Sequence, residues 1–374
     1  MIPAALVTFA ILALGGALAV TGLVRSRNMQ VWIGTWVRWS WKRRSSRRPP
    51  RRHVYFCFAD HYEPYGLGAD RERAHARVAR WVNEYPALAE RHRDSFGNRP
   101  RHSYFYPAEE YDPELLDALA GLRDRGLGDV EVHLHHDNDT PENFRRTITG
   151  FARTLHDRHG FLVEEPGTGR LLYTFIHGNW ALDNSRPDGR WCGIDNELAI
   201  LAETGCVADM TMPSAPSDTQ TSTINSIYFA LGRAGCRKSH DKGRPVRVGD
   251  WSRPGELLMI QGPLTLNWKE GKWGVLPRIE SGELSFDAPP SPHRIRLWGE
   301  CAISIEGAEE HVFIKVHTHG ATEKSMRMLF DQGGFDSLWT ELERQYRVDA
   351  DHTLRYVTAR EMVDTIRALA HGAG

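Results

Sequence analysis

The chain has 374 residues, of which 41% are hydrophobic and 25% charged; this composition excludes a disordered or fibrous protein and suits one large α/β domain with additions. The net charge of −1 hides an asymmetry, because residues 25–52 carry ten basic and no acidic residues, whereas the rest of the chain carries 37 basic and 48 acidic residues. A basic segment attached to an acidic body argues against a nucleic-acid enzyme, so no nucleic-acid partner is expected. The five cysteines are widely spaced and form no CxxC pair, which indicates reduced thiols.

The chain begins with an uncharged run of 23 residues, 2–24, which is long enough to cross a bilayer core of about 30 Å. No basic residue precedes this run, as a secretory signal peptide would require. The basic residues follow it, and the positive-inside rule then puts the rest of the chain on the cytoplasmic side. We therefore predict a single-pass transmembrane helix, residues 1–24, in the inner (cell) membrane, with the periplasmic face as the alternative location of the body.

Residues 25–52 are predicted to form a basic interfacial segment and a linker. Trp32, Trp36 and Trp39 share one face of a helix, which is typical of a helix that lies at the lipid headgroups. The alternative is a helix that packs on the protein core. The basic residues that follow favour the membrane surface, so membrane lipid is a predicted partner of this segment.

From residue 53 to residue 374, short β-rich runs alternate with helical patterns. The candidate strands are 54–59, 102–106, 130–134, 171–176, 207–212, 256–260 and 312–316. Helical spacing of apolar residues lies between them, around 78–85, 115–122, 144–155 and 198–202. This alternation predicts an α/β fold with about seven parallel strands, barrel-like closure and chemistry at the carboxyl ends of the strands. Residues 268–296, rich in Gly, Pro and Trp, interrupt the alternation and predict an inserted hairpin or flap.

Histidines and acidic residues gather directly after four of these strands. The segments are DHYEP (60–64), HLHHDND (133–139), HGNWALD (177–183) and HTHG (317–320). His133 and His135 share a strand face, and Asp139 follows His135 by four residues, about one helical turn. Such a set suits a divalent metal with nitrogen and oxygen ligands, whereas the lack of paired cysteines disfavours a structural zinc site. Alternatively, Asp139 or Thr140 caps the helix that begins at Pro141, and single histidines are hydrogen-bonded structural residues.

The segments FADHYEP (58–64) and HLHHDND (133–139) resemble the polysaccharide deacetylase (NodB-homology, carbohydrate esterase family 4) superfamily, over residues 53 to about 322. The resemblance is greatest to its subgroup linked to lipopolysaccharide and capsule biosynthesis. It implies a distorted (β/α) barrel and the removal of N- or O-acetyl groups from sugars at an Asp-His-His metal site. A divalent ion, zinc first, is the cofactor that the resemblance implies.

The resemblance also implies roles for individual residues. Asp60 takes the place of the metal-binding aspartate, His135 that of the first metal histidine and Asp139 that of the second. His133 would then supply the missing nitrogen ligand. His317, in the segment VFIKVHTHG, takes the place of the general acid.

The sequence departs from the family pattern at two positions. The aspartate that serves as base in the family aligns with Ala59, and the arginine-bearing third motif reads HGNW (177–180). The candidates for the base are His61, Glu63 and His177. The candidate substrate-binding residues are Asn179, Trp180, Asp183 and His319.

These features predict a membrane-anchored, metal-dependent carbohydrate deacetylase-like hydrolase that acts on a lipid-linked sugar or a surface-polysaccharide intermediate. One alternative is a metal-dependent glycosidase-like hydrolase on the same barrel, in which Asp60 or Glu63 pairs with Asp183 across the scissile bond. A second alternative is a non-catalytic protein that binds glycans or acts as a scaffold. Metal content separates the second alternative from the two enzymes, and acetate release against reducing-sugar release separates the enzymes from each other.

Overall fold

The computed structural model describes residues 20–45, 51–272, 276–348 and 351–372. The strands are β1 (Arg52–His61), β2 (His102–Pro107), β3 (Gly128–Leu134), β4 (Val163–Glu164), β5 (Leu171–His177), β6 (Cys206–Asp209), β7 (Ile227–Leu231), β8 (Arg244–Pro245), β9 (Glu256–Ile260), β10 (Thr265–Lys272), β11 (Leu276–Glu280), β12 (His311–Thr318) and β13 (His352–Tyr356). The helices are α2 (Ile33–Ser45), α3 (Arg71–Ala89), α4 (Pro113–Asp124), α5 (Pro141–His159), α6 (Glu197–Thr204), α7 (Pro292–Glu300), α8 (Glu323–Met326), α9 (Gly334–Tyr346) and α10 (Ala359–Ala370).

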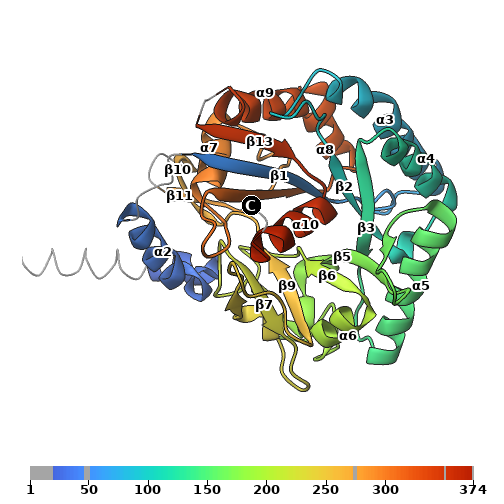
Figure 1. The fold of residues 1–374 in the computed structure, drawn as a ribbon, viewed down its shortest axis with the longest axis horizontal. Coiled ribbons are helices and arrows are strands. Elements are labelled where there is room, and N and C mark those ends of the chain that lie inside the picture. Colours follow the sequence, from blue (N-terminus) through green and yellow to red (C-terminus); the bar gives the residue numbers. More distant parts are fainter. Residues whose placement is uncertain (1–19, 46–50, 273–275, 349–350, 373–374) are drawn as a thin grey trace, which may run out of the picture.

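A curved, mostly parallel sheet organises the chain, in the order β12-β1-β2-β3-β5-β6-β9-β7-β8, with β13 beside the first half of β1 and β4 beside β5. Neighbouring strands run parallel along the path from β12 to β9, and β13 runs parallel to β1. Beyond this path, β7 pairs antiparallel with β9. Figure 1 shows α3, α4, α5 and α6 along the outside of the sheet and α10 at its centre. The carboxyl ends of the parallel strands therefore open toward one side of the molecule.

Local sequence signals explain where the outer helices begin. Asp112 accepts a hydrogen bond from the backbone of Glu114 ahead of Pro113, the first residue of α4. Thr140 does the same for α5, accepting from the backbone of Asn143 ahead of Pro141. A capping side chain followed by proline matches the free backbone donors at a helix start.

Strand alternation divides the apolar residues between two cores. On β1, Phe56 and Phe58 face outward and pack under α3 and α9, whereas Cys57 and Ala59 face inward. The inner core is completed by α10, whose buried Met362, like its apolar neighbours on that helix, fills the space inside the curved sheet. The inward-facing apolar side chains of the sheet therefore pack on α10, and polar side chains lie at the carboxyl ends of the strands.

The mixed α/β fold with a mostly parallel sheet is confirmed, and each of the seven predicted strands is present. The described strands contain no ladder that joins β12 to β7, β8 or β9, so the predicted barrel closure is not seen in hydrogen bonds. A side chain spans this side instead: Lys315 of β12 donates to the carbonyl oxygens of Met210 and Met212, just after β6, at 2.6 Å for Met212. Four further described strands, β4, β7, β8 and β13, were not predicted from the sequence.

The predicted transmembrane segment, 2–24, falls mostly on residues 1–19, which lie outside the described residues. Among the described residues, no helix is long and apolar enough to cross a membrane. The predicted interfacial face requires correction. Trp32 is fully buried with Ile224 and Leu264, and the indole of Trp36 donates to the Thr265 hydroxyl at 2.9 Å. The alternative of a core-packed helix therefore holds for these two residues, and Trp39 is partly buried against the inner core. Trp41, with 73% of its surface exposed, faces solvent.

The stretch 268–296 contains part of an antiparallel hairpin, β10–β11, in which Leu266 lies opposite Ile279. A buried ion pair fastens the hairpin to α7: the Arg294 guanidinium donates to both Glu280 oxygens, at 2.7 and 2.8 Å. The indole of Trp298 donates to the same carboxylate at 2.8 Å. The stretch therefore contains a hairpin that is anchored to α7, and its role as a flap stays a prediction.

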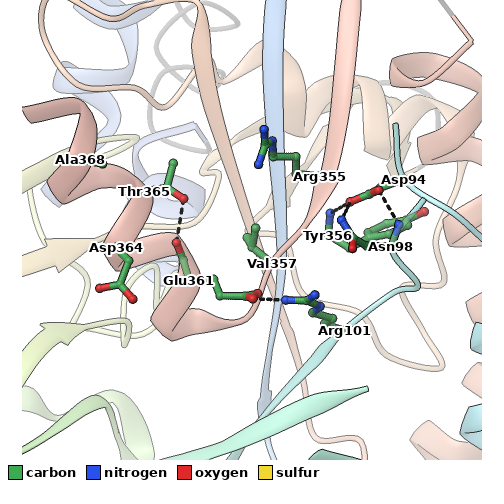
Figure 2. A pocket seen from close by; sticks show the side chains of 10 residues that line it. All are labelled: Asp94, Asn98, Arg101, Arg355, Tyr356, Val357, Glu361, Asp364, Thr365 and Ala368. Carbon is green, nitrogen blue, oxygen red and sulfur yellow. Dashed lines mark hydrogen bonds and ion pairs between the residues drawn. The ribbon is translucent and has the colours of Figure 1, made fainter. Parts of the chain in front are cut away.

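A cavity of about 470 Å³ lies near the start of β2 and the first turns of α10, away from the strand ends that carry the histidines (Figure 2). Arg101 is paired with Glu361 across it, and the Asp94 carboxylate accepts from the Tyr356 backbone at 3.2 Å. These polar groups satisfy one another, and the histidines lie at the opposite ends of the strands.

Candidate metal centre

Two groups of potential metal ligands lie at the carboxyl ends of the strands. In the first, His61, Glu63 and His133 bring ligand atoms within 4.8 Å of one another, and we call these residues, with His135 and His319, the open cluster. In the second, His136, His177, Cys192 and Glu197 do the same, and we call these four residues the closed cluster. The segment that follows β3 supplies both clusters.

Glu63 lies at the centre of the open cluster. Its Oε1 atom is 3.3 Å from His133 Nε2, 3.6 Å from His135 Nε2 and 4.0 Å from His319 Nε2. Burial alone would raise the pKa of Glu63, but the hydrogen bond from His133 and the charges of the neighbouring histidines lower this pKa to about 2. Glu63 is therefore a carboxylate at neutral pH, aimed at three imidazoles.

Outer contacts fix the orientation of two of these imidazoles. His133 Nδ1 lies 2.7 Å from the carbonyl oxygen of Ile176, and His135 Nδ1 lies 2.6 Å from a Glu109 oxygen. Because a carbonyl oxygen and a carboxylate oxygen only accept, each Nδ1 donates and carries its proton. Each Nε2 then turns toward Glu63, where a second ring proton or a bound cation is needed between the nitrogen and the carboxylate. A histidine held by a carbonyl or carboxylate through its other nitrogen is typical of metal ligands.

His61 completes the wall of the cluster. It is the last residue of β1 and faces inward like Ala59, with ring centroids 5.0 Å from His133 and 4.9 Å from His319. Burial first, and then the charges of the surrounding histidines, lower the pKa of His61 well below 6.5. A neutral imidazole is the form that binds a metal.

An aromatic side chain covers this site. Trp180, in the 3-10 turn η3 (Gly178–Trp180) after β5, places its ring centroid 5.8 Å from that of His61 and 6.1 Å from that of His319. Asn179, the residue before it, has a left-handed φ of 54°. Gly178 passes so close that a Cβ there would overlap the His135 ring. The predicted substrate-binding residues Trp180 and His319 thus lie at the open cluster.

Asp60 belongs to neither cluster, which corrects its predicted position beside His135. Its side chain is fully buried on the outer face of β1, where it accepts from His102 Nε2 at 2.9 Å and from the Gly320 backbone at 2.7 Å. A Cβ at residue 320 would overlap this carboxylate. Because β1 continues to His61, strand alternation turns Asp60 away from the inward-facing residues.

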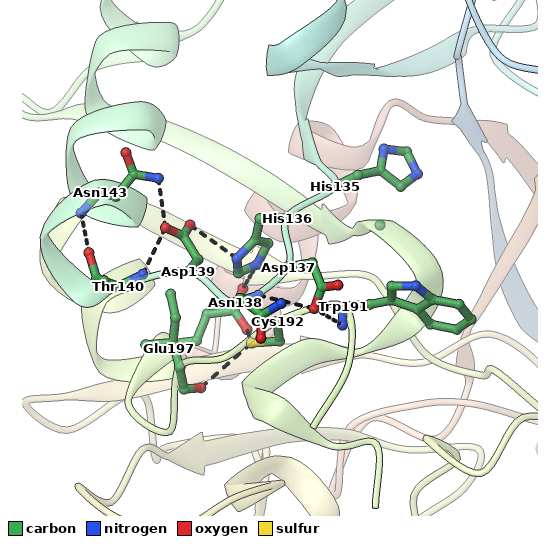
Figure 3. Close-up of polar contacts among 12 residues, drawn as sticks. His135, His136, Asp137, Asn138, Asp139, Thr140, Asn143, Trp191, Cys192 and Glu197 are labelled. Atoms are coloured by element: carbon green, nitrogen blue, oxygen red, sulfur yellow. Dashed lines mark hydrogen bonds and ion pairs between the residues drawn. The ribbon is translucent and has the colours of Figure 1, made fainter. Parts of the chain in front are cut away.

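Asp139 also lies apart from His135, contrary to the predicted pair. Figure 3 shows Asp139 turned toward His136, with His135 pointing the other way, and the Asp139–His136 distance is 3.2 Å. Residues 135–140 precede α5 and are not helical, with a left-handed φ of 48° at Asn138, so the four-residue spacing does not act as a helical turn. Thr140, not Asp139, accepts the capping hydrogen bond of α5.

His177 and Asp183, predicted as base and substrate ligand, lie at the closed cluster. His177 is fully buried, and burial lowers its pKa to about 4 despite the opposing charge of Glu197. Asp183 is fully buried as well and accepts from the Ser239 backbone at 2.7 Å. Neither residue belongs to the open cluster, where a base or a substrate ligand would have to lie.

His317, the predicted general acid, lies on β12 with its ring centroid 6.0 Å from that of His61. Its backbone donates to Gly282 and accepts from Leu284, so the segment after the hairpin holds it in place. Burial, followed by the charge of Lys315, lowers the pKa of His317 to about 3. At neutral pH this imidazole is neutral and ready to accept a proton, whereas its assignment as the acid stays a prediction.

The site contains residues that the sequence analysis did not single out. Glu109 orients His135, His102 binds Asp60, and His136, Cys192 and Glu197 build the closed cluster. His136 belongs to the segment HLHHDND, but Cys192 and Glu197 follow no strand directly, so the spacing of the sequence did not predict them as ligands.

Comparison with known proteins adds a structural likeness. No family model matches this sequence, and no curated protein matches it. Among solved structures, a protein described as a putative polysaccharide deacetylase from Mycobacterium smegmatis has 10% sequence identity and a TM-score of 0.42, covering 87% of this chain and 94% of its own. At this level of similarity no residue of that protein is matched to a residue here.

Proposed function

We propose that this chain is a metal-dependent hydrolase that removes acyl groups from carbohydrate and that the open cluster is its catalytic centre. The observation that carries the proposal is the convergence of three imidazole Nε2 atoms on a single Glu63 oxygen. One divalent ion would satisfy all of these donors at once. Histidine and carboxylate donors with neighbouring exposed positions are typical of catalytic metal sites, which keep a position free for water or substrate.

The donor set fits a zinc ion held by His61, Glu63 and His133, with His135 and His319 beside them. The ion would lower the pKa of a bound water and polarise the acyl carbonyl. Glu109 and the Ile176 carbonyl keep the Nε2 atoms of the two β3 histidines turned inward. His317 would move a proton between the attacking water and the leaving sugar atom, as the sequence resemblance implies.

Trp180 supports carbohydrate as the substrate class. Its indole is half-buried beside His61 and His319 and would present a flat apolar surface to one face of a sugar ring. The glycosidase-like alternative loses support, because it needs a second accessible carboxylate, and both Asp60 and Asp183 are buried and hydrogen-bonded.

We further propose a substrate at the membrane, either a lipid-linked sugar or a surface-polysaccharide intermediate, with the body of the chain on the cytoplasmic side. The uncharged run 2–24 and the basic residues after it support this proposal. A tether of this kind raises the local concentration of a membrane-bound substrate without any new contact. A reporter fused to the carboxyl terminus should be active in the cytoplasm, and activity only outside the cytoplasm would overturn the orientation.

Acetate release by the full-length chain tests the function. The probes are N-acetylated and O-acetylated oligosaccharides, assayed as purified, after EDTA treatment and after zinc is restored. We expect acetate release that EDTA abolishes and zinc restores. Release of reducing ends without acetate would indicate the glycosidase, and a folded chain that retains no metal and releases neither product would indicate a glycan-binding or scaffold protein. Glu203→Gln, a substitution at an exposed position of α6, is the control variant and should release acetate as the parent chain does.

A further inference from the structure

The closed cluster joins four separate segments in the protein interior. His136 comes from the loop after β3, His177 from the end of β5, Cys192 from the loop before α6, and Glu197 from its first turn. The side chains of His177 and Glu197 are fully buried, and that of His136 is 6% exposed. Four ligand-type side chains sealed from solvent need mutual satisfaction, because an unpaired buried polar group is costly.

The two imidazoles meet at their Nε2 atoms. His177 Nδ1 points at the carbonyl oxygen of Gly178, which can only accept, so this nitrogen donates. The lone pair of His177 is therefore on Nε2, which lies 2.9 Å from His136 Nε2. His136 Nδ1 lies 3.2 Å from an Asp139 oxygen, but no hydrogen bond joins these two atoms (Figure 3). A cation beside both Nε2 atoms would bind the lone pair of His177 and, with the His136 proton on Nδ1, that of His136 as well.

The carboxylate and the thiol face the same point. Glu197 Oε2 accepts from the Asp183 backbone at 2.6 Å and from Cys192 Sγ at 3.4 Å. Glu197 Oε1 is left facing the imidazoles, 3.3 Å from His136 Nε2 and 3.5 Å from His177 Nε2. Two nitrogens, one oxygen and one sulfur therefore surround a common centre.

We propose that the closed cluster is a second metal site, independent of the open cluster, in which His136, His177, Cys192 and Glu197 bind one zinc ion. Four ligands with no solvent-facing position are typical of structural zinc, and a thiol favours zinc over magnesium or calcium. The thiol proton of Cys192 leaves to solvent as the ion binds, giving the thiolate ligand. The Gly178 carbonyl holds His177 from behind, and the Asp139 carboxylate lies behind His136.

The site would fix a segment that regular secondary structure does not hold. Between β5 and α6, the backbone adopts left-handed φ values of 53° at Asp183, 51° at Asn184 and 67° at Trp191. The same segment carries Trp180, which packs on His61 of the open cluster. A zinc ion between His177 and Glu197 would tie both ends of this segment together and keep Trp180 in place.

Cobalt substitution of the full-length chain tests this proposal separately from the proposed function. Only the closed cluster contains a thiol, so only this site can give the thiolate-to-cobalt charge-transfer absorption in the near ultraviolet. We expect this absorption in the cobalt-loaded chain, its complete loss in Cys192→Ser, and its retention in Cys206→Ser, another buried cysteine. Absence of the absorption from the folded, cobalt-loaded chain, or its persistence in Cys192→Ser, overturns the proposal.

A second measurement needs no substitution and therefore does not depend on how Cys192→Ser folds. Zinc X-ray absorption of the unaltered chain should show a sulfur neighbour at about 2.3 Å beside nitrogen and oxygen neighbours. Zinc with nitrogen and oxygen neighbours alone would leave the open cluster intact and overturn the closed one. Zinc with a sulfur neighbour in a chain that releases no acetate would support the closed cluster and overturn the proposed function of the open cluster.

Discussion

The open and closed clusters share one strand end but differ in access to solvent. In the open cluster the side chains of His135 and His319 are 30% and 37% exposed, whereas in the closed cluster those of His177 and Glu197 are fully buried. The open cluster offers nitrogen and oxygen donors only, and the closed cluster adds a thiol. Access separates a centre that can exchange water and substrate from one that can only hold the fold together. The difference in access therefore supports the proposed catalytic role of the open cluster and the proposed structural role of the closed cluster.

The largest effect should come from the centre of the open cluster. Glu63→Gln removes the charge that faces three imidazoles, and we expect kcat/KM for acetate release to fall by about 10³-fold, because a metal contributes several kcal/mol to the transition state. Glu109→Gln, which only orients His135, should cost about 10–100-fold. Equal losses in the two variants, or none in Glu63→Gln, would contradict the central place of Glu63.

Substitution in the closed cluster should lower the free energy of unfolding. Glu197→Gln leaves two buried imidazoles without their carboxylate, and we expect the free energy of unfolding to fall by about 3 kcal/mol. Denaturant titration of the full-length chain measures this loss. Glu203→Gln, on the exposed face of the same helix, should change the value by less than about 0.5 kcal/mol. A Glu197→Gln chain as stable as the parent would remove the structural role.

The pH dependence of that stability sharpens the contrast. In the metal-free chain, burial raises the pKa of Glu197, but the charges of His177 and His136 lower it to about 2, below its ordinary 4.5. A lowered acid pKa contributes stability that is fully present above the unfolded value and is lost as the pH falls through the folded value. The difference between parent and Glu197→Gln, measured with chelator present, should therefore shrink from pH 4.5 toward pH 2. It should also shrink above about pH 6.5, because burial lowers the pKa of His136 but Glu197 raises it above its ordinary value, and stability from a raised histidine pKa is lost as the pH rises. A difference that grows between pH 4.5 and pH 2 would contradict this assignment.

The smallest effect concerns the side chain that links the two clusters. Trp180→Ala removes the surface proposed to stack on the sugar, and we expect KM to rise about tenfold, or about 1.4 kcal/mol, with kcat little changed. Trp41→Ala, an exposed tryptophan on α2, is the control and should leave KM unchanged. A fall in kcat at constant KM would show that Trp180 positions the catalytic histidines and does not bind the sugar.

Hydrophobic alternation was enough to predict the strands but not the direction of every polar side chain. β1 was predicted to end at residue 59, and its two further residues turn Asp60 outward and His61 inward. β13 was missed because its five residues, HTLRY, mix polar and apolar types and gain their stability from pairing with β1. β7 was missed because it enters the sheet antiparallel, outside the β/α alternation.

The site was predicted in part for a similar reason. His133, His61 and Glu63 were named from their place after strands, which is a local property. Cys192 and Glu197 reach their cluster only through the left-handed turns of the loop before α6, and hydrophobic periodicity does not predict the course of such a loop. The absence of paired cysteines disfavours a structural zinc site, whereas the zinc that we propose for the closed cluster would use a single thiol with three other donors.

Anomalous diffraction from crystals of the full-length chain, grown with zinc and measured on both sides of the zinc absorption edge, tests the two-cluster account most directly. The account predicts one peak between Glu63 and the histidines around it and a second peak between His136 and His177. Absence of a peak at Glu63 would contradict the catalytic centre, and absence of the peak at His136 would contradict the structural one.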